Sequence, residues 1–150
     1  MVIKNRKPRT RRGAFTLLEI LLVVGLLALL ASFAIPALMG QAEKGKIDIA
    51  KAAIGPNGSI SQAIDMFKFN TGLYPAELKD LIDKPSDDKV AQKWTGPYLK
   101  DVSGLTDPWG NEYMYEADGK HNVGKIDMWS KGPDGIDGND DDVPNWKTDK

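Results

Sequence analysis

The sequence predicts an α+β fold, in which a long N-terminal helix packs on a small antiparallel β-sheet. Two observations support this prediction. Residues 15–69 carry apolar and helix-forming residues at helical spacing, with one interruption at residues 55–58. Residues 112–130 instead hold two short runs with aromatic and other apolar residues, separated by a turn. Helices that come first and strands that come later are typical of the α+β class.

An apolar stretch at residues 15–39 dominates the first part of the chain, and Glu19 is its only charged residue. Its length meets the roughly 20 residues that a helix needs to cross a bilayer. Because apolar side chains occupy every face, such a helix is buried only in lipid or among other helices. We therefore predict a membrane-spanning helix. An acidic side chain inside it is energetically costly, so Glu19 needs a functional reason.

The residues before Gly13 are strongly basic and include no acid. Their six positive charges come from Lys4, Arg6, Lys7, Arg9, Arg11 and Arg12. Such flanks resist translocation, so we expect a cytoplasmic N-terminus and an extracytoplasmic remainder. This orientation explains the basic charge more simply than binding to nucleic acid does. The 20 bases less these six leave 14 against all 21 acids, so the part after Gly13 has a formal charge of −7.

Three interpretations of the N-terminus compete. A cleaved signal peptide has an apolar region of about 7 to 15 residues before a small-x-small site. Residues 32–34 (Ser-Phe-Ala) provide such a site, but the apolar stretch is too long and carries Glu19. A plain signal anchor explains the length and the basic flank but leaves the carboxylate unexplained. The third interpretation rests on the residues around Phe15.

Residues 11–19, with the sequence Arg-Arg-Gly-Ala-Phe-Thr-Leu-Leu-Glu, closely resemble the cleavage region of type IV pilin-like precursors. The resemblance implies that a prepilin peptidase removes a basic leader, residues 1–14, and that Phe15 becomes the N-methylated first residue. It also implies that Glu19 pairs with the terminal amine of a neighbouring subunit. Residues 15–39 would then be a transmembrane and assembly helix, and residues 40–150 a pilin-like globular domain.

One residue departs from the family pattern, because Ala14 stands between Gly13 and Phe15. Cleavage after Ala14 keeps the glutamate at its usual place, whereas cleavage after Gly13 shifts it by one, so we favour cleavage after Ala14. Pairing is physically reasonable, since a terminal amine with a pKa near 8 is largely cationic and neutralises a carboxylate in a low dielectric. The alternative is that Glu19 reaches toward the lipid headgroups.

The helical pattern continues beyond the apolar stretch. Ile47, Ala50 and Ile54 share one face of a helix that ends at the breaker Gly-Pro-Asn-Gly, residues 55–58. Ser59 is a candidate cap of a renewed helix. The apolar face of that helix holds Ile60, Ala63, Ile64 and Phe67. We interpret the breaker as a kink or short insertion in an otherwise long helix.

The later elements are shorter. We expect a helix at residues 76–83, a polar loop at residues 84–93, and strands at residues 112–116 and 124–130. The turn at residues 118–120 makes the two strands antiparallel neighbours. The apolar face of this small sheet is expected to pack on the exposed half of the long helix, which follows the apolar stretch.

Four turn motifs narrow the resemblance. They are Asn-Thr-Gly-Leu-Tyr-Pro at residues 70–75, Trp-x-Gly-Pro-Tyr-Leu at 94–99, Asp-Pro-Trp-Gly-Asn-x-Tyr at 107–113 and Ser-x-Gly-x-Asp-Gly at 130–135. Gly, Pro and aromatic residues often build turns, but four matches in order are not explained by chance. Over residues 11–146 the chain resembles the major pseudopilins, or G subunits, of the type II secretion system.

An acidic loop follows the second predicted strand. Residues 134–142 hold five Asp and no base, and the spacing is not that of an EF-hand. Composition alone leaves a calcium loop and a solvated acidic loop equally open. The resemblance implies a structural calcium ion. Its side-chain ligands would be Asp134, Asp141 and Asp142, its carbonyl ligands would be Lys131 and Ile136, and Asp137 and Asp140 stay unassigned.

Residues suited to catalysis are scarce, so we do not expect an enzyme. The chain has no Cys, which excludes disulfides and thiolate metal sites. Its one His, His121, lies in a turn and is more often a solvated side chain than a catalytic base. No Gly-rich loop carries the Lys of a P-loop.

The resemblance implies a structural subunit. Processed copies would leave the inner membrane and form a helical filament, a periplasmic pseudopilus that drives protein export. Minor pseudopilins, an inner-membrane assembly platform, the prepilin peptidase and, before assembly, membrane lipid would be its partners. The alternatives are a type IV pilus or minor pilin subunit, which commonly carries a C-terminal disulfide, and a signal-anchored extracytoplasmic binding or hydrolytic domain.

Overall fold

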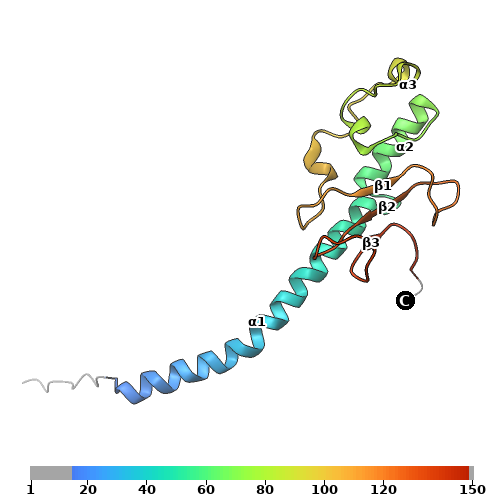
Figure 1. Cartoon of the computed structure of the whole chain (residues 1–150). Helices are drawn as coiled ribbons and strands as arrows, with labels where there is room; N and C mark the ends of the chain where they lie inside the picture. The colour runs from blue at the N-terminus through green and yellow to red at the C-terminus, as the bar shows by residue number, and fades with distance from the viewer. Residues whose placement is uncertain (1–14, 149–150) are drawn as a thin grey trace, which may run out of the picture. The chain divides into compact units, whose positions relative to one another are not determined.

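A computed structural model describes residues 15–148 of the chain, which divides into two compact units between Gly40 and Gln41. All helices precede the three short strands along the chain (Figure 1). This order confirms the predicted α+β class.

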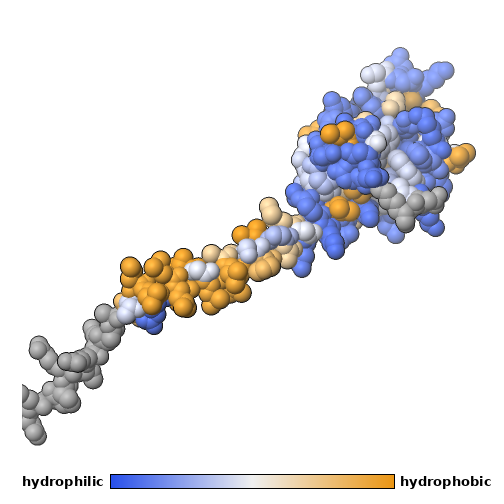
Figure 2. All heavy atoms as spheres, turned by 60° about the horizontal axis from the view of Figure 1, so that its bottom comes forward, coloured by the Kyte–Doolittle hydropathy of each residue, from blue (hydrophilic) through white to orange (hydrophobic). Residues whose placement is uncertain are grey.

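The N-terminal unit holds the apolar part of helix α1, which runs from Leu17 to Ile54 and continues through Pro36. Thr16 caps its start, because the Thr16 side-chain oxygen accepts the backbone N–H of Glu19 at 3.2 Å. Apolar side chains cover this part of α1 in the view of Figure 2. Among the described residues, one helix is long and apolar enough to cross a membrane, with a mean hydropathy of 2.6 over its most apolar window.

The predicted helix break is confirmed. Helix α1 ends at Ile54 and helix α2 runs from Ser59 to Thr71. The predicted cap at Ser59 is wrong, since Gly58 occupies the capping position without any side-chain hydrogen bond. The side chain of Ser61 instead donates to the backbone oxygen of Ile54 at 3.0 Å and joins the two helices across the break.

Short helical elements follow α2, which ends at Gly72 in the left-handed conformation with a φ of 85°. The predicted helix at residues 76–83 is only a 3₁₀ turn, η1, over Leu78–Leu81. The predicted polar loop at residues 84–93 contains helix α3, Asp88–Lys93. Helix α3 buries no residue, so it has no apolar pattern to reveal it; the carboxylate of Asp87 caps it by accepting two backbone N–H groups. A second 3₁₀ turn, η2, spans Val102–Leu105.

The sheet has three antiparallel strands in the order β1-β2-β3. Strands β1 (Met114–Glu116) and β2 (Asp127–Ser130) lie within the two predicted runs, and Tyr115 pairs with Met128. Strand β3 (Val143–Pro144) was not predicted, because two residues at the end of an acidic run carry no alternation. It pairs with β2 through Ser130 and Val143.

One apolar core holds the C-terminal unit together. Its buried residues come from α1, α2, η1, η2, β2, β3 and the residues that directly precede β1 and β2. The buried members are Ala50, Ile54, Ile60, Ala63, Ile64, Phe67, Leu78, Leu81, Leu105, Tyr113, Ile126, Met128 and Val143. Every residue that the helical spacing of residues 60–67 placed on the apolar face is buried here. The predicted packing of the sheet on the helices is therefore confirmed.

A buried carboxylate organises the turn between β1 and β2. Asp127 is 1% exposed and accepts the backbone N–H groups of His121 at 2.7 Å and Asn122 at 2.9 Å. Burial by itself raises the pKa of Asp127, but these backbone donors outweigh it, so its pKa lies below the ordinary value of 3.8. The ionised carboxylate thus accepts hydrogen bonds from backbone N–H groups of this turn, which lies outside the ladder of strand hydrogen bonds.

The break between α1 and α2 requires glycine. A Cβ at Gly58 would lie 2.0 Å from the backbone oxygen of Ala53. We expect Gly58→Ala to lower the free energy of unfolding by about 1–3 kcal/mol, as for other overpacking substitutions. Chemical denaturation measures this. The control is Gly45→Ala in the interior of α1, where a Cβ meets nothing within 4 Å and the better helix former changes stability by at most about 1 kcal/mol, in the stabilising direction. Equal stability of the Gly58→Ala variant and the wild type would contradict this account.

Asp127→Asn should lower the free energy of unfolding by about 1–3 kcal/mol, because an amide offers one acceptor oxygen where the carboxylate offers two. The pKa of Asp127 is lower in the folded than in the unfolded chain. Its contribution is therefore complete above the unfolded value of about 3.9 and is lost as pH falls through the folded value. Unfolding curves at several pH values should show a shallower acid limb in Asp127→Asn. Asp118→Asn, an exposed acid of the same turn, should behave as the wild type.

Candidate functional sites

Phe15 directly precedes the start of α1 and Glu19 lies in its first turn, and both residues are exposed. Phe15 is 75% exposed, and Glu19 lies in the first turn of the helix, where the helix dipole favours a negative charge. The Thr16 side chain, which accepts the backbone N–H of Glu19, caps this turn. The other two residues of the predicted processing site, Gly13 and Ala14, lie outside the described residues.

The apolar side chains that follow Glu19 are unburied within one copy of the chain. The large ones are at least 46% exposed and comprise Leu17, Leu18, Ile20, Leu21, Leu22, Val23, Val24, Leu26, Leu27, Leu29, Leu30, Phe33, Ile35, Leu38 and Met39. Monomeric soluble proteins rarely expose an apolar surface of this extent. This surface needs lipid or other helices as its environment.

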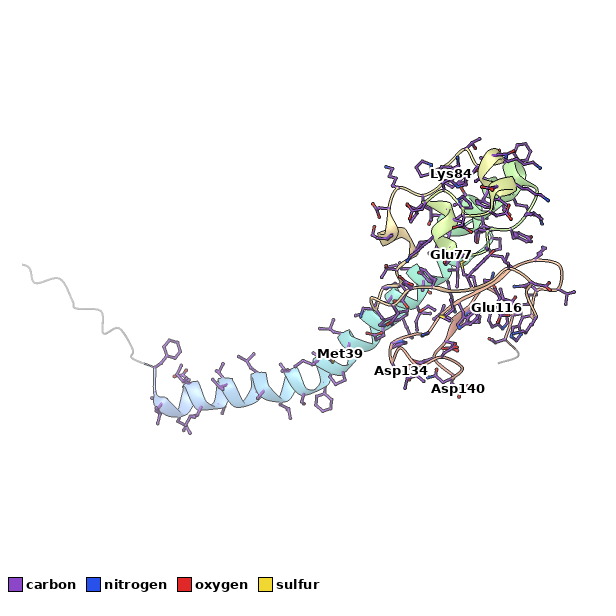
Figure 3. The ribbon with its side chains drawn as sticks, turned by 45° about the horizontal axis from the view of Figure 1, so that its top comes forward. Met39, Glu77, Lys84, Glu116, Asp134 and Asp140 are labelled. Atoms are coloured by element: carbon purple, nitrogen blue, oxygen red, sulfur yellow. The ribbon has the colours of Figure 1, made fainter. Side chains whose placement is uncertain are left out.

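The acidic loop connects β2 to β3 and closes tightly on itself. Gly132 and Gly135 adopt positive φ angles of 67° and 70°. A Cβ at Gly132 would lie 2.3 Å from the backbone oxygen of Asp141, so the two ends of the loop touch there. Figure 3 shows Asp134 and Asp140 on this loop.

Two of the three predicted side-chain ligands, Asp134 and Asp141, are joined by a hydrogen bond, and the third, Asp142, is bound elsewhere in the loop. The backbone N–H of Asp134 donates to a carboxylate oxygen of Asp141 at 3.3 Å, and the N–H of Ile136 donates to Asp134 at 2.8 Å. The N–H of Gly138 donates to Oδ2 of Asp142 at 2.8 Å. The two predicted carbonyl ligands, Lys131 and Ile136, belong to the same closed loop.

One atom of this loop fits a bound cation. Oδ1 of Asp142 is buried and has no hydrogen-bond partner, although a buried ionised oxygen without a donor is costly. Among residues 15–148, no three acidic or histidine side chains are grouped so that they could hold a metal ion. A metal in this loop therefore needs backbone carbonyl oxygens as further ligands. Calcium accepts such mixed sets of hard oxygens.

Asp137 differs from the other acids of the loop. Its carboxylate accepts the indole N–H of Trp129, on β2, at 2.6 Å. This contact joins the loop to the outer face of the sheet. No sequence pattern indicates this pairing, because the two residues are eight positions apart in a segment without regular spacing.

Hydrogen bonds lead from α1 to the start of the acidic loop. The indole N–H of Trp109 donates to Glu43 at 2.8 Å, and the backbone N–H of Trp109 donates to Asp107 at 3.0 Å. The second oxygen of Asp107 accepts the hydroxyl of Ser130 at 2.6 Å, and the Ser130 oxygen accepts the N–H of Gly132 at 3.1 Å. The hydrogen bond from Trp109, followed by the charge of Lys46, holds the pKa of the Glu43 carboxyl below its ordinary value.

Sequence reasoning found the motif at residues 107–113 but missed its partner Glu43. A charged residue on a helix is commonly solvated, and only the fold shows that the indole of Trp109 reaches it. The motif therefore connects a helix to a loop, and the role of each residue is structural.

The motifs at residues 70–75 and 94–99 also join separate elements. The amide of Asn70 donates to Thr95 at 2.7 Å and to the hydroxyl of Tyr98 at 3.1 Å. The indole of Trp94 donates to the backbone oxygen of Asp80 at 2.8 Å. These contacts attach the segment around α3 to the end of α2 and to η1, and they explain the aromatic and turn residues without any ligand.

Comparison with known proteins agrees with these features. The family model described as "Type II secretion system (T2SS), protein G" matches residues 37–146. Type II secretion system core protein G of Pectobacterium carotovorum is 38% identical over 144 residues, which cover 93% of this chain and 88% of the relative. The corresponding protein of Pseudomonas aeruginosa is 37% identical over 145 residues, covering 92% of this chain and 97% of the relative.

A solved structure shows the same fold. The crystal structure of the major pseudopilin from the type 2 secretion system of enterohaemorrhagic Escherichia coli matches with a TM-score of 0.60 and 26% identity. The match covers 73% of this chain and 93% of that one. The resemblance suggested by the four turn motifs is thus confirmed, and the chain belongs to the protein G family of the type II secretion system.

Proposed function

We propose that the chain is the structural subunit of a periplasmic pseudopilus that drives protein export through the type II secretion system. The observation that carries this proposal is the exposed apolar part of α1, with Glu19 as its one charge, in a member of the protein G family. A helix of this kind is buried in lipid before assembly and among copies of itself afterwards. Neither state requires catalysis.

The orientation follows from charge. The basic segment before Gly13 stays in the cytoplasm, the apolar part of α1 crosses the inner membrane once, and the acidic C-terminal unit lies in the periplasm. The minor pseudopilins and an inner-membrane assembly platform are the further partners in this proposal. They would receive subunits that carry the same apolar helix.

Processing prepares the subunit for assembly. In this proposal a prepilin peptidase cleaves between Ala14 and Phe15, and the new amine becomes methylated. The cationic amine of one copy then pairs with Glu19 of its neighbour. The exposure of both Phe15 and Glu19, and the short capped turn between them, support a contact made with another molecule.

Glu19→Gln should be processed normally but should form at least about tenfold fewer filaments, because removing one partner of a buried ion pair typically costs about 3–5 kcal/mol. Filaments sheared from cells that also produce the peptidase are quantified by immunoblot. Asp48→Asn, an exposed carboxylate farther along α1, is the matched control and should assemble as the wild type.

Mass spectrometry of the mature N-terminus accompanies this experiment. Both variants should begin at methylated Phe15. A chain that begins at Met1 or Ile35 would contradict the processing step. Abundant filaments from the Glu19→Gln variant would contradict the pairing.

The acidic loop is proposed to hold one structural calcium ion. Side-chain oxygens of Asp134, Asp141 and Asp142, with the carbonyl oxygens of Lys131 and Ile136, are the proposed ligands. The unpaired buried oxygen of Asp142 and the tight closure at Gly132 support this set. Calcium supplies the positive charge that five neighbouring carboxylates lack, and an extracytoplasmic site need bind only in the range of about 10⁻⁴ to 10⁻³ M.

Calcium should raise the melting temperature of the full-length protein in detergent by several degrees. A ligand at about 100 times its Kd adds about 2.7 kcal/mol to stability. Asp134→Ala and Asp142→Asn should lose this calcium-dependent increase, which differential scanning fluorimetry measures. Asp83→Asn, an exposed acid outside the loop, should retain it. An unchanged melting temperature of the wild type on adding calcium or a chelator would contradict the calcium site.

A further inference from the structure

A pocket lies beside the acidic loop, with a volume of about 230 Å³. Its walls come from the turn between β1 and β2, from the outer face of β2, and from both the loop and the segment after β3. Three aromatic residues line it, His121, Trp129 and Trp146, together with the acidic residues Glu116, Asp127, Asp137 and Asp142. Figure 3 places Glu116 at the end of β1.

The aromatic wall is preformed. The His121 ring stacks on Trp146 with ring centroids 4.1 Å apart and an angle of 4° between the planes. Trp129 meets Trp146 edge to face at 5.7 Å and 68°. Two of these residues are fixed further, since Asp127 accepts the backbone N–H of His121 and Asp137 accepts the indole of Trp129. The rings therefore present a fixed π surface.

The polar atoms of the pocket are mainly acceptors. Its one lysine, Lys120, already donates to Glu116 at 2.9 Å, and the indole N–H of Trp129 is used by Asp137. The Lys120–Glu116 hydrogen bond, together with the charge of Glu116, raises the pKa of Lys120. Four carboxylates, those of Glu116, Asp127, Asp137 and Asp142, face this single lysine, so the lining has an excess of negative charge.

Asp142 also lines the pocket. Its Oδ2 receives the N–H of Gly138, and its buried Oδ1 is assigned to the proposed calcium ion rather than to a ligand of this pocket. A neutral ligand with hydroxyl groups would leave the excess charge uncompensated. A ligand that brings only donors and a positive charge fits both the acceptors and the π surface.

We propose that this pocket binds an organic cation, an alkylammonium or guanidinium group on a short apolar stem. The charged head lies toward Asp137, and the stem or the guanidinium plane contacts the rings of Trp146 and Trp129. The site is distinct in chemistry from the proposed calcium loop, because calcium uses hard oxygen ligands and gains nothing from aromatic rings. Asp142 borders both, so binding is measured with calcium held constant.

The sequence limits where such a cation comes from. After Gly13 the chain has 14 lysines and no arginine. A second processed copy of this chain therefore provides an ammonium group but never a guanidinium group. A guanidinium in the pocket belongs to a different protein or to a free small molecule.

Titration of the full-length processed protein in detergent micelles tests the proposal. The probes are n-butylammonium and n-butylguanidinium, and N-butylurea is the uncharged counterpart of the latter. The indole N–H resonances of Trp129 and Trp146 should shift and saturate with both cations, and N-butylurea should cause no saturable shift. Trp94 and Trp109 lie outside the pocket, so their resonances should stay in place and show that the fold is intact.

Two variants locate the binding. Asp137→Asn keeps an oxygen for the indole of Trp129 but removes the charge, and should weaken cation binding about tenfold, as expected for one lost charge-assisted contact. Trp146→Leu should weaken it through loss of the π surface. Asp118→Asn, which removes one carboxylate outside the pocket, should bind as the wild type. Equal binding of N-butylurea, or unchanged affinity in both Asp137→Asn and Trp146→Leu, would overturn the proposal.

A further measurement distinguishes the sources. If a lysine of a second copy fills the pocket, saturating n-butylammonium should reduce self-association in sedimentation velocity, and Asp137→Asn should reproduce that loss without the probe. If the sedimentation is unchanged while the indole resonances still saturate, the cation belongs to another molecule. Both results retain the binding site and differ only in its occupant.

Discussion

The exposed apolar surface of α1 is the constraint on which the rest of the chain depends. Burying apolar surface gains about 25 cal/mol per Å², so a helix with apolar side chains on every face does not remain in water. Lipid and neighbouring helices are equivalent in this respect, and a transfer between them therefore conserves most of the burial energy. A charge such as Glu19 distinguishes the two environments, because only a neighbouring protein offers a fixed cationic partner.

The C-terminal unit is stabilised in a different way. Its core is small, and many of its segments are turns that a buried side chain or an aromatic N–H holds in place. Asp127 satisfies the turn between β1 and β2, Asp107 satisfies the turn at residues 107–111, and Trp94 attaches the region of α3. Three strands of two to four residues give little ladder, so these side-chain hydrogen bonds replace much of the usual backbone pairing.

The sequence was informative where periodicity or turn chemistry was strong. The apolar helix, the break at residues 55–58, the buried face of α2 and two strands followed from spacing and turn residues. Helix α3 and strand β3 did not, because one buries no residue and the other has two residues. The acidic loop was evident from composition, but the contacts Trp109–Glu43 and Trp129–Asp137 were not, since they depend on how distant segments meet in three dimensions.

The bond between Trp109 and Glu43 spans 66 residues. Together with the covalent chain from Glu43 through α2 to Trp109, this hydrogen bond forms a closed loop that includes most of the globular unit. A load applied along the helix at Glu43 therefore enters that unit by two routes, the backbone and the indole, and reaches the turn at residues 107–111 without first passing through the break at Gly58. In a filament subunit, mechanical stress is therefore shared between the helix break at residues 55–58 and the hydrogen bond from Trp109 to Glu43.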